Sequence, residues 1–224
     1  MKLYNFSRSG TSIRARIALE LKGLPYNYVG VDLPAGEHRK GAYLDISPDT
    51  LVPLLEVDEH TRISQSLALI EYLDETHPEP PLLPADPWGR AQVRALALTA
   101  ACEIHPINNM RVLQYLSREL GVDEGARSAW YNHWILEGLH HYENRLRHLQ
   151  RDRQARGLPP SLYSFGSTPT LADCALVPQV INGRRFGLDY SRKDFPLTLA
   201  AFDACMQLPA VQRALPEACP PDVA

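Results

Sequence analysis

Short apolar runs alternate with amphipathic segments over the first eighty residues of the chain. Ile13, Ile17 and Leu21 recur every fourth residue up to Gly23, a spacing that predicts a helix. A second helix is predicted over residues 65–77, and a short one in the polar stretch around residues 37–39. The strand-like runs are residues 2–5, 26–31, 51–57 and 61–63. The predicted order is therefore strand, helix, strand, short helix, two strands and helix.

Beyond residue 78 the strand signals disappear and the pattern becomes helical. Long helical faces are predicted over residues 90–120, with a kink at Pro106, and over 123–150, followed by a polar loop at 151–160. The run Thr170-Leu171-Ala172-Asp173 has the spacing of a capping box and predicts the start of another helix. The prolines between the two patterns are Pro78, Pro80, Pro81, Pro84 and Pro87. We therefore expect a small strand-containing domain over residues 1–84 and an all-helical domain over 88–224.

Composition narrows the class of protein. The 224 residues carry a formal net charge of −3, which disfavours a nucleic-acid-binding protein that neutralises phosphates. The N-terminal residues lack the apolar core of a secretory signal, and no apolar run reaches the length of a membrane span. Cysteines are few and none forms a Cys-x-x-Cys pair; they are Cys102, Cys174, Cys205 and Cys219. We expect a cytoplasmic protein with reduced cysteines and with neither nucleic-acid nor membrane partners.

Three polar features suggest anion and peptide binding in the first domain. Hydroxyl groups cluster in residues 8–14, where a strand gives way to a helix whose unpaired N–H groups suit an anion such as a thiolate. Val52-Pro53 stands before a predicted strand, and a cis bond there would leave the Val52 backbone free for an extended ligand. Gln65-Ser66 opens a helix and could hold a carboxylate. Plain helix capping is the alternative for both hydroxyl-rich helix starts.

Structural roles are favoured for the polar residues of the second domain. His133, Glu137, His140 and His141 could suggest a metal-binding face, but no His-Glu-x-x-His pattern accompanies them, and we expect no metal site. Trp130 and Trp134 are interpreted as packing residues.

These features together resemble the glutathione transferase family. The resemblance is carried by residues 4–23, Val52-Pro53, Gln65-Ser66 with the helix that follows, Leu82-Leu83-Pro84, and Thr170-Leu171-Ala172-Asp173. It extends to residues 104–109 and 176–180, and therefore covers nearly the whole chain. More narrowly, these residues resemble the zeta class of the family, the maleylacetoacetate and maleylpyruvate isomerases.

The resemblance implies an α/β thioredoxin-like N-terminal domain that binds glutathione and an all-α C-terminal domain that forms most of the second-substrate pocket. It implies a homodimer that acts on a small unsaturated acid. The implied catalytic residues are Ser9, Thr11 and Arg8. The implied glutathione-binding residues are His38, Val52, Gln65, Ser66, His105 and Asn109. The implied substrate-binding residues are Arg8, Met110, Arg111 and Arg185.

The chain departs from the family pattern at several positions, including Asp49 and Leu51, which replace polar residues common before the Val-Pro pair. Ser7 stands where an aromatic residue is usual, and Ile13 where histidine or tryptophan is usual. Met110 stands where the maleylpyruvate enzymes carry a second arginine beside Arg111. An arginine forms a strong two-pronged bond with a carboxylate, so we expect a less charged substrate than that of the maleylpyruvate enzymes.

The activity implied is cis-trans isomerisation of an unsaturated carboxylic acid, with glutathione as a catalyst that is not consumed. Two alternatives remain open at the level of the sequence. A transferase or dehalogenase would use the same thiolate on another electrophile, and a non-enzymatic protein of this fold would serve as a binding module.

Overall fold

The computed structural model describes residues 1–222 and divides the chain into two compact units. The first unit contains residues 1–82 and the segment from residue 206 onward, and the second contains residues 83–205. Each unit has its own layer of buried apolar side chains. The expected domains 1–84 and 88–224 differ from these units in the last segment, which belongs with the first unit because α9 (Pro209–Arg213) packs on α1 (Gly10–Leu21).

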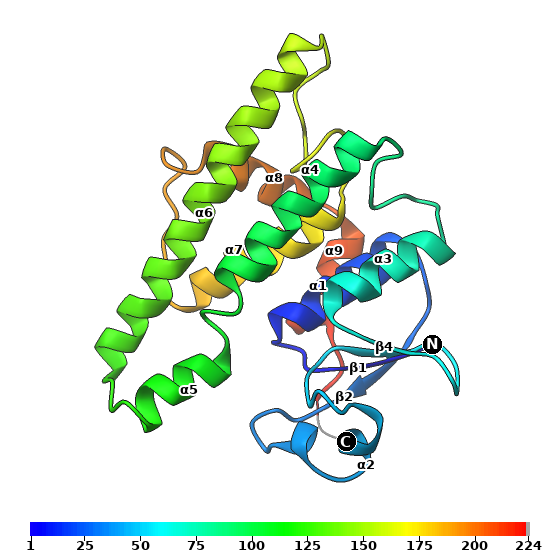
Figure 1. Cartoon of the computed structure of the whole chain (residues 1–224), viewed down its shortest axis with the longest axis vertical. Coiled ribbons are helices and arrows are strands. Elements are labelled where there is room, and N and C mark those ends of the chain that lie inside the picture. The colour runs from blue at the N-terminus through cyan, green and yellow to red at the C-terminus, as the bar shows by residue number, and fades with distance from the viewer. Residues whose placement is uncertain (223–224) are drawn as a thin grey trace. The chain divides into compact units, whose positions relative to one another are not determined.

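A four-stranded mixed sheet forms the base of the first unit (Figure 1). Its strands are β1 (Lys2–Asn5), β2 (Asn27–Gly30), β3 (Leu54–Glu56) and β4 (Arg62–Ser64), in the order β2-β1-β3-β4. β1 runs parallel to β2 and antiparallel to β3, and β4 runs antiparallel to β3. The parallel pair requires a crossover, which α1 provides. This arrangement confirms the thioredoxin-like order expected from the sequence.

Two helices of the first unit pack against each other beside the sheet, as Figure 1 shows for α1 and α3. The helices of this region are α1 (Gly10–Leu21), η1 (Glu37–Arg39), α2 (Gly41–Ile46) and α3 (Ser66–Thr76). Ile13 is fully buried, so this departure from the family pattern fills the core rather than a pocket surface. The helices expected in this region correspond to α1, η1 and α3, whose ends lie within a few residues of the predicted ones.

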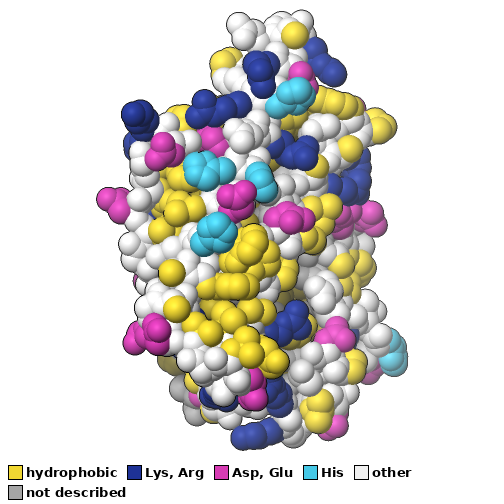
Figure 2. All heavy atoms as spheres, turned by 60° about the vertical axis from the view of Figure 1, so that its left-hand side comes forward, with side chains coloured by type: hydrophobic (Ala, Val, Ile, Leu, Met, Phe, Trp, Pro, Cys, Tyr) yellow, Lys and Arg dark blue, Asp and Glu magenta, His cyan; other side chains and the backbone are white. Residues whose placement is uncertain are grey.

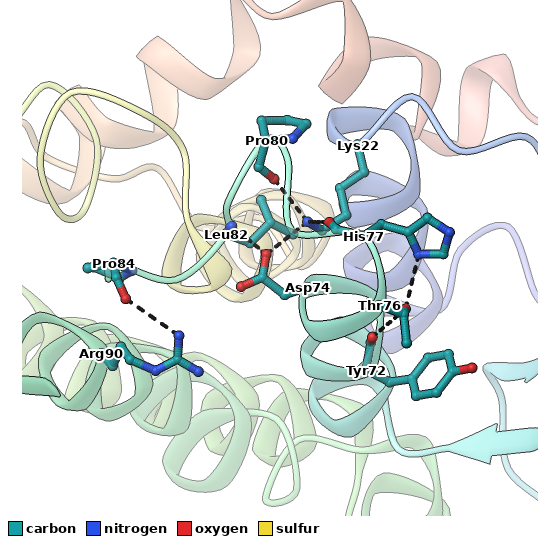
Figure 3. Close-up of polar contacts among 9 residues, drawn as sticks. All are labelled: Lys22, Tyr72, Asp74, Thr76, His77, Pro80, Leu82, Pro84 and Arg90. Carbon is teal, nitrogen blue, oxygen red and sulfur yellow. Dashed lines mark hydrogen bonds and ion pairs between the residues drawn. The ribbon is translucent and has the colours of Figure 1, made fainter. Parts of the chain in front are cut away.

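A buried ion pair holds the end of α3 and the chain after it against α1 (Figure 3). Lys22 Nζ lies 2.8 Å from Asp74 Oδ1 and donates to the carbonyls of His77 and Pro80 at 2.8 and 2.9 Å. Asp74 Oδ1 also accepts the Leu82 N–H at 2.7 Å. The Lys22 side chain is 0% exposed and that of Asp74 is 8% exposed, so this ion pair is buried.

The last described segment of the chain completes the first unit. It contains α9 (Pro209–Arg213) and the short helix η3 (Pro216–Ala218). Arg16, fully buried on α1, donates from Nε to the Ala214 carbonyl at 2.9 Å. The same guanidinium donates to Asn5 Oδ1 at 2.5 Å and to the Ser7 carbonyl at 2.6 Å. One arginine thus joins β1, the loop after it and the C-terminal segment.

The second unit is built from helices alone in the part of the chain that the structure describes. The helices are α4 (Pro87–Leu98), η2 (Thr99–Ile104), α5 (Met110–Arg118), α6 (Glu124–Ala155), α7 (Leu171–Arg185) and α8 (Pro196–Met206). α7 is buried along nearly its whole length and packs on α4, η2 and α6. None of the helices within residues 1–222 is both long and apolar enough to cross a membrane.

Two buried carboxylates fix the starts of α7 and α8. The predicted capping box is confirmed: Asp173 accepts the Thr170 and Ser164 backbone N–H groups, each at 2.8 Å. Burial raises the pKa of Asp173. Glu143 on α6 accepts the Thr198 N–H and hydroxyl of α8, each at 2.8 Å. These carboxylates satisfy the unpaired N–H groups of two helix ends inside the unit.

The helix predicted over residues 90–120 is broken into three segments. α4 passes into the wide turn of a π-helix, η2, and α5 begins anew after Asn109, whose Oδ1 accepts the Arg111 N–H. A side chain on Gly138 of α6 would put its Cβ 2.2 Å from Ile104 Cγ1, so glycine lets η2 approach α6 closely. The single kink expected at Pro106 is therefore wrong, because Asn109 starts a separate helix.

Two further expectations are corrected at the ends of helices. α6 continues to Ala155, so half of the polar loop expected at residues 151–160 is helical. α8 was not predicted, because its apolar residues surround the helix rather than follow one face.

Candidate functional site

The first helix of the chain begins with a hydroxyl cap. Ser9 is the N-cap of α1, and its Oγ accepts the Ser12 N–H at 3.3 Å. Among the described residues, the N–H groups of Gly10 and Thr11 have no acceptor. A helix start with free N–H groups carries a positive partial charge and favours a bound anion.

Ser9, Thr11 and Val52 form a continuous hydrogen-bonded chain. Ser9 Oγ lies 2.8 Å from Thr11 Oγ1, which in turn donates to the Val52 carbonyl at 2.9 Å. A hydroxyl has one proton, so Thr11, whose proton goes to Val52, must accept from Ser9. The Ser9 proton is therefore the one that can turn toward a new acceptor without freeing the Val52 carbonyl.

The loop before β3 presents the Val52 backbone. The Val52–Pro53 bond is cis, as the sequence pattern suggested. The Leu51 carbonyl is held by the hydroxyls of Tyr43 and Ser47, both from the α2 region. Among the described residues the Val52 N–H has no acceptor, so Val52 offers one donor and the second lone pair of its carbonyl to an extended ligand. Tyr43 and Ser47 were missed in the sequence, where no spacing links them to residue 51.

The start of α3 is open. Gln65, which precedes the helix, has φ of 65° and ψ of 110°, a conformation that non-glycine residues rarely adopt. No side chain caps the helix, whereas α1, α4, α5 and α6 each have a side-chain cap. Ser66 is buried at the first helical position, and its hydroxyl has no bond among the described residues. Strained backbone beside an uncapped helix start is the arrangement expected of an anion-binding turn.

His38 lies in η1 with an unsatisfied ring nitrogen. Its Nδ1 is buried and makes no hydrogen bond within residues 1–222. Burial, and secondly the neighbouring charge of Arg39, lowers the pKa of His38, so the ring is neutral near pH 7. A neutral imidazole can donate or accept one bond to a polar ligand.

The other implied site residues lie on exposed or half-buried positions. Arg8 is exposed in the loop between β1 and α1. In the second unit, His105 Nε2 and Asn109 Nδ2 lie 3.4 Å apart. Met110 is 61% exposed at the first position of α5, so it does not face the interior of the helical unit. The two remaining arginines, both exposed, are Arg111 on α5 and Arg185 at the end of α7.

Two of the four histidines of α6 pair with acidic side chains, and the other two, His133 and His140, lie against the rings of Trp134 and Phe195. His141 lies 3.5 Å from Glu137, and His148 lies 3.6 Å from Asp152. Figure 2 shows histidine side chains next to acidic ones, above a surface where hydrophobic side chains gather. Within residues 1–222, no group of three histidine, cysteine or acidic side chains could hold a metal ion.

Comparison with known proteins places this chain in a family. Residues 3–81 match the family model described as Glutathione S-transferase, N-terminal domain. The chain is 51% identical to the maleylpyruvate isomerase of a Ralstonia species, over 98% of this chain and 99% of that protein. The chain belongs to the glutathione transferase family.

Solved structures relate this glutathione transferase to the zeta class. The holo structure of a maleylpyruvate isomerase, described as a bacterial zeta-class glutathione transferase, is 50% identical with a TM-score of 0.89 over 98% of this chain and 99% of that one. The maleylacetoacetate isomerase of Methylobacterium extorquens AM1, solved with malonate and glutathione, is 33% identical with a TM-score of 0.88 over 98% of each chain. The transferase described here is thus a zeta-class member by sequence and by fold.

Proposed function

We propose that this glutathione transferase is a glutathione-dependent cis-trans isomerase of an unsaturated carboxylic acid of the maleylpyruvate or maleylacetoacetate type. The observation that carries the proposal is the hydrogen-bonded chain Ser9–Thr11–Val52 at the free N-terminus of α1. The Ser9 hydroxyl at one end of this chain can stabilise a thiolate. The Val52 backbone at the other end can bind the peptide that carries the thiolate. The identity of 51% to a maleylpyruvate isomerase supports the choice of reaction.

The residues of the first unit fit glutathione, which is a small anionic peptide. We assign the backbone of Val52 to the cysteinyl unit, since its N–H is free and its carbonyl keeps a lone pair. Gln65, Ser66 and the uncapped start of α3 would bind the γ-glutamyl carboxylate. The unpaired nitrogen of His38 gives a further polar contact. His105 and Asn109 are proposed to complete this binding.

The chain's own groups stabilise negative charge on the thiol sulfur. When bound, glutathione supplies a thiolate that adds reversibly to the conjugated double bond and so permits rotation about it. A free thiol has a pKa of about 8.5, so a site active at neutral pH must favour the charged form. The Ser9 hydroxyl can donate to the sulfur while Thr11 keeps its bond to Val52, and the N–H groups of Gly10 and Thr11 add the helix-end charge.

Arginines are the proposed ligands of the substrate carboxylates. Arg8, Arg111 and Arg185 have exposed side chains, and a planar guanidinium binds a carboxylate through two parallel bonds. The same cations would stabilise the enolate that develops during addition. We propose that Met110, exposed beside Arg111, contacts an apolar part of the substrate.

Turnover per glutathione distinguishes isomerisation from its alternatives. We expect the purified chain to convert maleylpyruvate to its trans isomer through many cycles for each glutathione supplied, because an isomerase regenerates the thiol. The measurement is loss of the cis acid by ultraviolet absorbance with glutathione held far below the substrate concentration. Reaction that stops at one product per glutathione would indicate a transferase, and binding without reaction would indicate a binding module.

Met110 gives a prediction about substrate choice. The wild type should prefer a longer cis-unsaturated monoacid to maleylpyruvate, because a flexible apolar side chain replaces one carboxylate-binding arginine. Met110→Arg should shift preference toward maleylpyruvate by roughly tenfold to a hundredfold, the effect of a charged hydrogen bond worth about 1.5–3 kcal/mol. The check is kcat/KM of both proteins on both acids. Equal preferences in the two proteins would rule out a role for this position.

Two assignments go beyond the chemistry of the site. We propose a homodimer, supported by the resemblance to the glutathione transferases and by the apolar side chain of Leu98 on α4, which is 46% exposed. We also propose a cytoplasmic location, supported by the free thiols of all four cysteines, since glutathione keeps thiols reduced there.

A further inference from the structure

The C-terminal segment returns to the start of α1 and ends its described course at Asp222. Asp222 Oδ1 accepts the Ser7 backbone N–H at 2.7 Å and the Tyr28 hydroxyl at 2.6 Å, and Oδ2 accepts the Ser7 hydroxyl. Three donors from two parts of the first unit therefore meet on one carboxylate. Hydrogen bonds to an ionised acceptor are roughly twice as strong as neutral ones.

Gly30 makes room for this contact. A Cβ on Gly30 would lie 2.4 Å from the Asp222 carbonyl oxygen and 2.6 Å from its Cα, distances that only movement of the segment could relieve. Gly30 does not have a positive φ, so the close approach is the feature that requires glycine. The end of β2 is thus shaped to receive the C-terminal segment.

Ser7 is held on one side by the C-terminal segment and on the other by Arg16 of α1, which itself binds that segment. Its N–H and hydroxyl bond to Asp222, and its carbonyl accepts Arg16 Nη2, whose guanidinium also binds the Ala214 carbonyl. The next turn of the loop is fixed by the Ser9 N–H, which donates to the Phe6 carbonyl at 3.0 Å. The path of the backbone from Ser7 to Ser9 therefore depends on contacts made more than two hundred residues later in the chain.

We propose that Asp222 is a positioning residue for the sulfur site, which acts by holding Ser7 so that Arg8 and the Ser9 hydroxyl keep their places at the start of α1. This inference rests on the proposed function, since it concerns the same thiol. It also accounts for Ser7, which stands where the family usually has an aromatic residue. A serine leaves its N–H and hydroxyl open to a carboxylate supplied from the C-terminal segment.

The first test measures the loop without any ligand. Asp222→Ala should speed hydrogen–deuterium exchange of the peptide around Ser7 by about tenfold, the effect of losing one well-formed hydrogen bond. Asp222→Asn keeps an oxygen for the Ser7 N–H but loses the charge, so its exchange should lie between that of the wild type and that of Asp222→Ala. Glu75→Ala, which removes an exposed carboxylate from α3 in the same unit, is the matched control and should change nothing. Unchanged exchange in Asp222→Ala would overturn the proposal.

The second test measures the bound thiol. With glutathione bound, Asp222→Ala should raise the pKa of the thiol by about 1, read from thiolate absorbance, while the glutathione Kd changes less than about threefold. Gly30→Ala should act in the same direction by displacing the segment, although alanine is the better residue within a strand. Asp222→Asn should recover part of the wild-type titration, which a loss of general stability would not predict.

The outcomes separate this proposal from the proposed function. Faster exchange in Asp222→Ala with an unmoved thiol titration would show that Asp222 serves only the fold, and would overturn its positioning role. If wild-type protein binds no glutathione in calorimetry, the proposed function fails, and the positioning role fails with it. The exchange result would in that case still report whether Asp222 holds Ser7.

Discussion

Ser9→Ala should lower kcat/KM for the isomerisation by about a hundredfold at pH 6.5, the scale of losing one donor aimed at developing charge. The hydrogen-bond geometry gives the reason. Thr11 commits its proton to the Val52 carbonyl, so Ser9 has the proton that can turn to the sulfur. The free N–H groups at the start of α1 remain in the variant, so the activity should not vanish.

The loss should depend on pH in a definite direction. Without the Ser9 donor the pKa of the bound thiol rises toward its free value of about 8.5, so less thiolate is present at low pH. The deficit should therefore shrink as the pH is raised from 6.5 to 9. The measurements are a pH–rate profile and the thiolate absorbance of the bound complex. A deficit that is equal at every pH would contradict sulfur activation by Ser9.

Thr11→Val is the matched variant. It removes the bond to the Val52 carbonyl but leaves the Ser9 proton available, so it should weaken glutathione binding more than it moves the thiol titration. Ser9→Thr keeps a hydroxyl and should recover most of the activity. If Thr11→Val moves the thiol titration more than Ser9→Ala does, Thr11 and not Ser9 is the residue that activates the sulfur.

Lys22→Met should destabilise the first unit by about 3–5 kcal/mol, the range for leaving a buried charge without its partner. The variant retains most of the length of the side chain but leaves the buried Asp74 carboxylate without its cation and removes the donor to the carbonyls of His77 and Pro80. Urea unfolding gives the change as a lower midpoint with an unchanged slope.

The surface offers a control for this prediction. Arg213 pairs with Glu20 at 2.7 Å in the same unit, but its side chain is 59% exposed, so Arg213→Ala should cost less than about 1 kcal/mol. Asp74→Asn keeps an acceptor for the Leu82 N–H and should cost less than Lys22→Met. Equal losses in Lys22→Met and Arg213→Ala would mean that burial does not govern the strength of this pair.

Local pattern predicted most of the first unit, because each of its elements has its own period and its own end signal. The run of Ile13, Ile17 and Leu21 with Gly23 after it locates α1, whose last helical residue is Leu21. The second unit was harder. α8 is apolar around its circumference and gives no helical period, and the turn before α5 depends on Asn109 acting as a cap.

The residues of the candidate site also differ in whether the sequence alone could reveal them. Ser9, Thr11, Val52 and Ser66 could be found because each lies at the end of a helix or strand, where unpaired backbone groups bind ligands. Tyr43 and Asp222 could not, because their partners Leu51 and Ser7 are set by tertiary contacts that no sequence period records. The roles of the implied site residues themselves stay predictions.

The π-helical turn η2 sets a limit on how the length of this chain can vary. A π-helical turn holds one residue more than an α-helical turn, so removing one residue from Thr99–Ile104 would restore α-helical winding. It would also move Ile104 away from Gly138, leaving a gap on α6 that a larger residue could fill. Natural deletions in this segment should therefore occur together with a side chain at position 138, and proteins that retain the extra residue should retain the glycine.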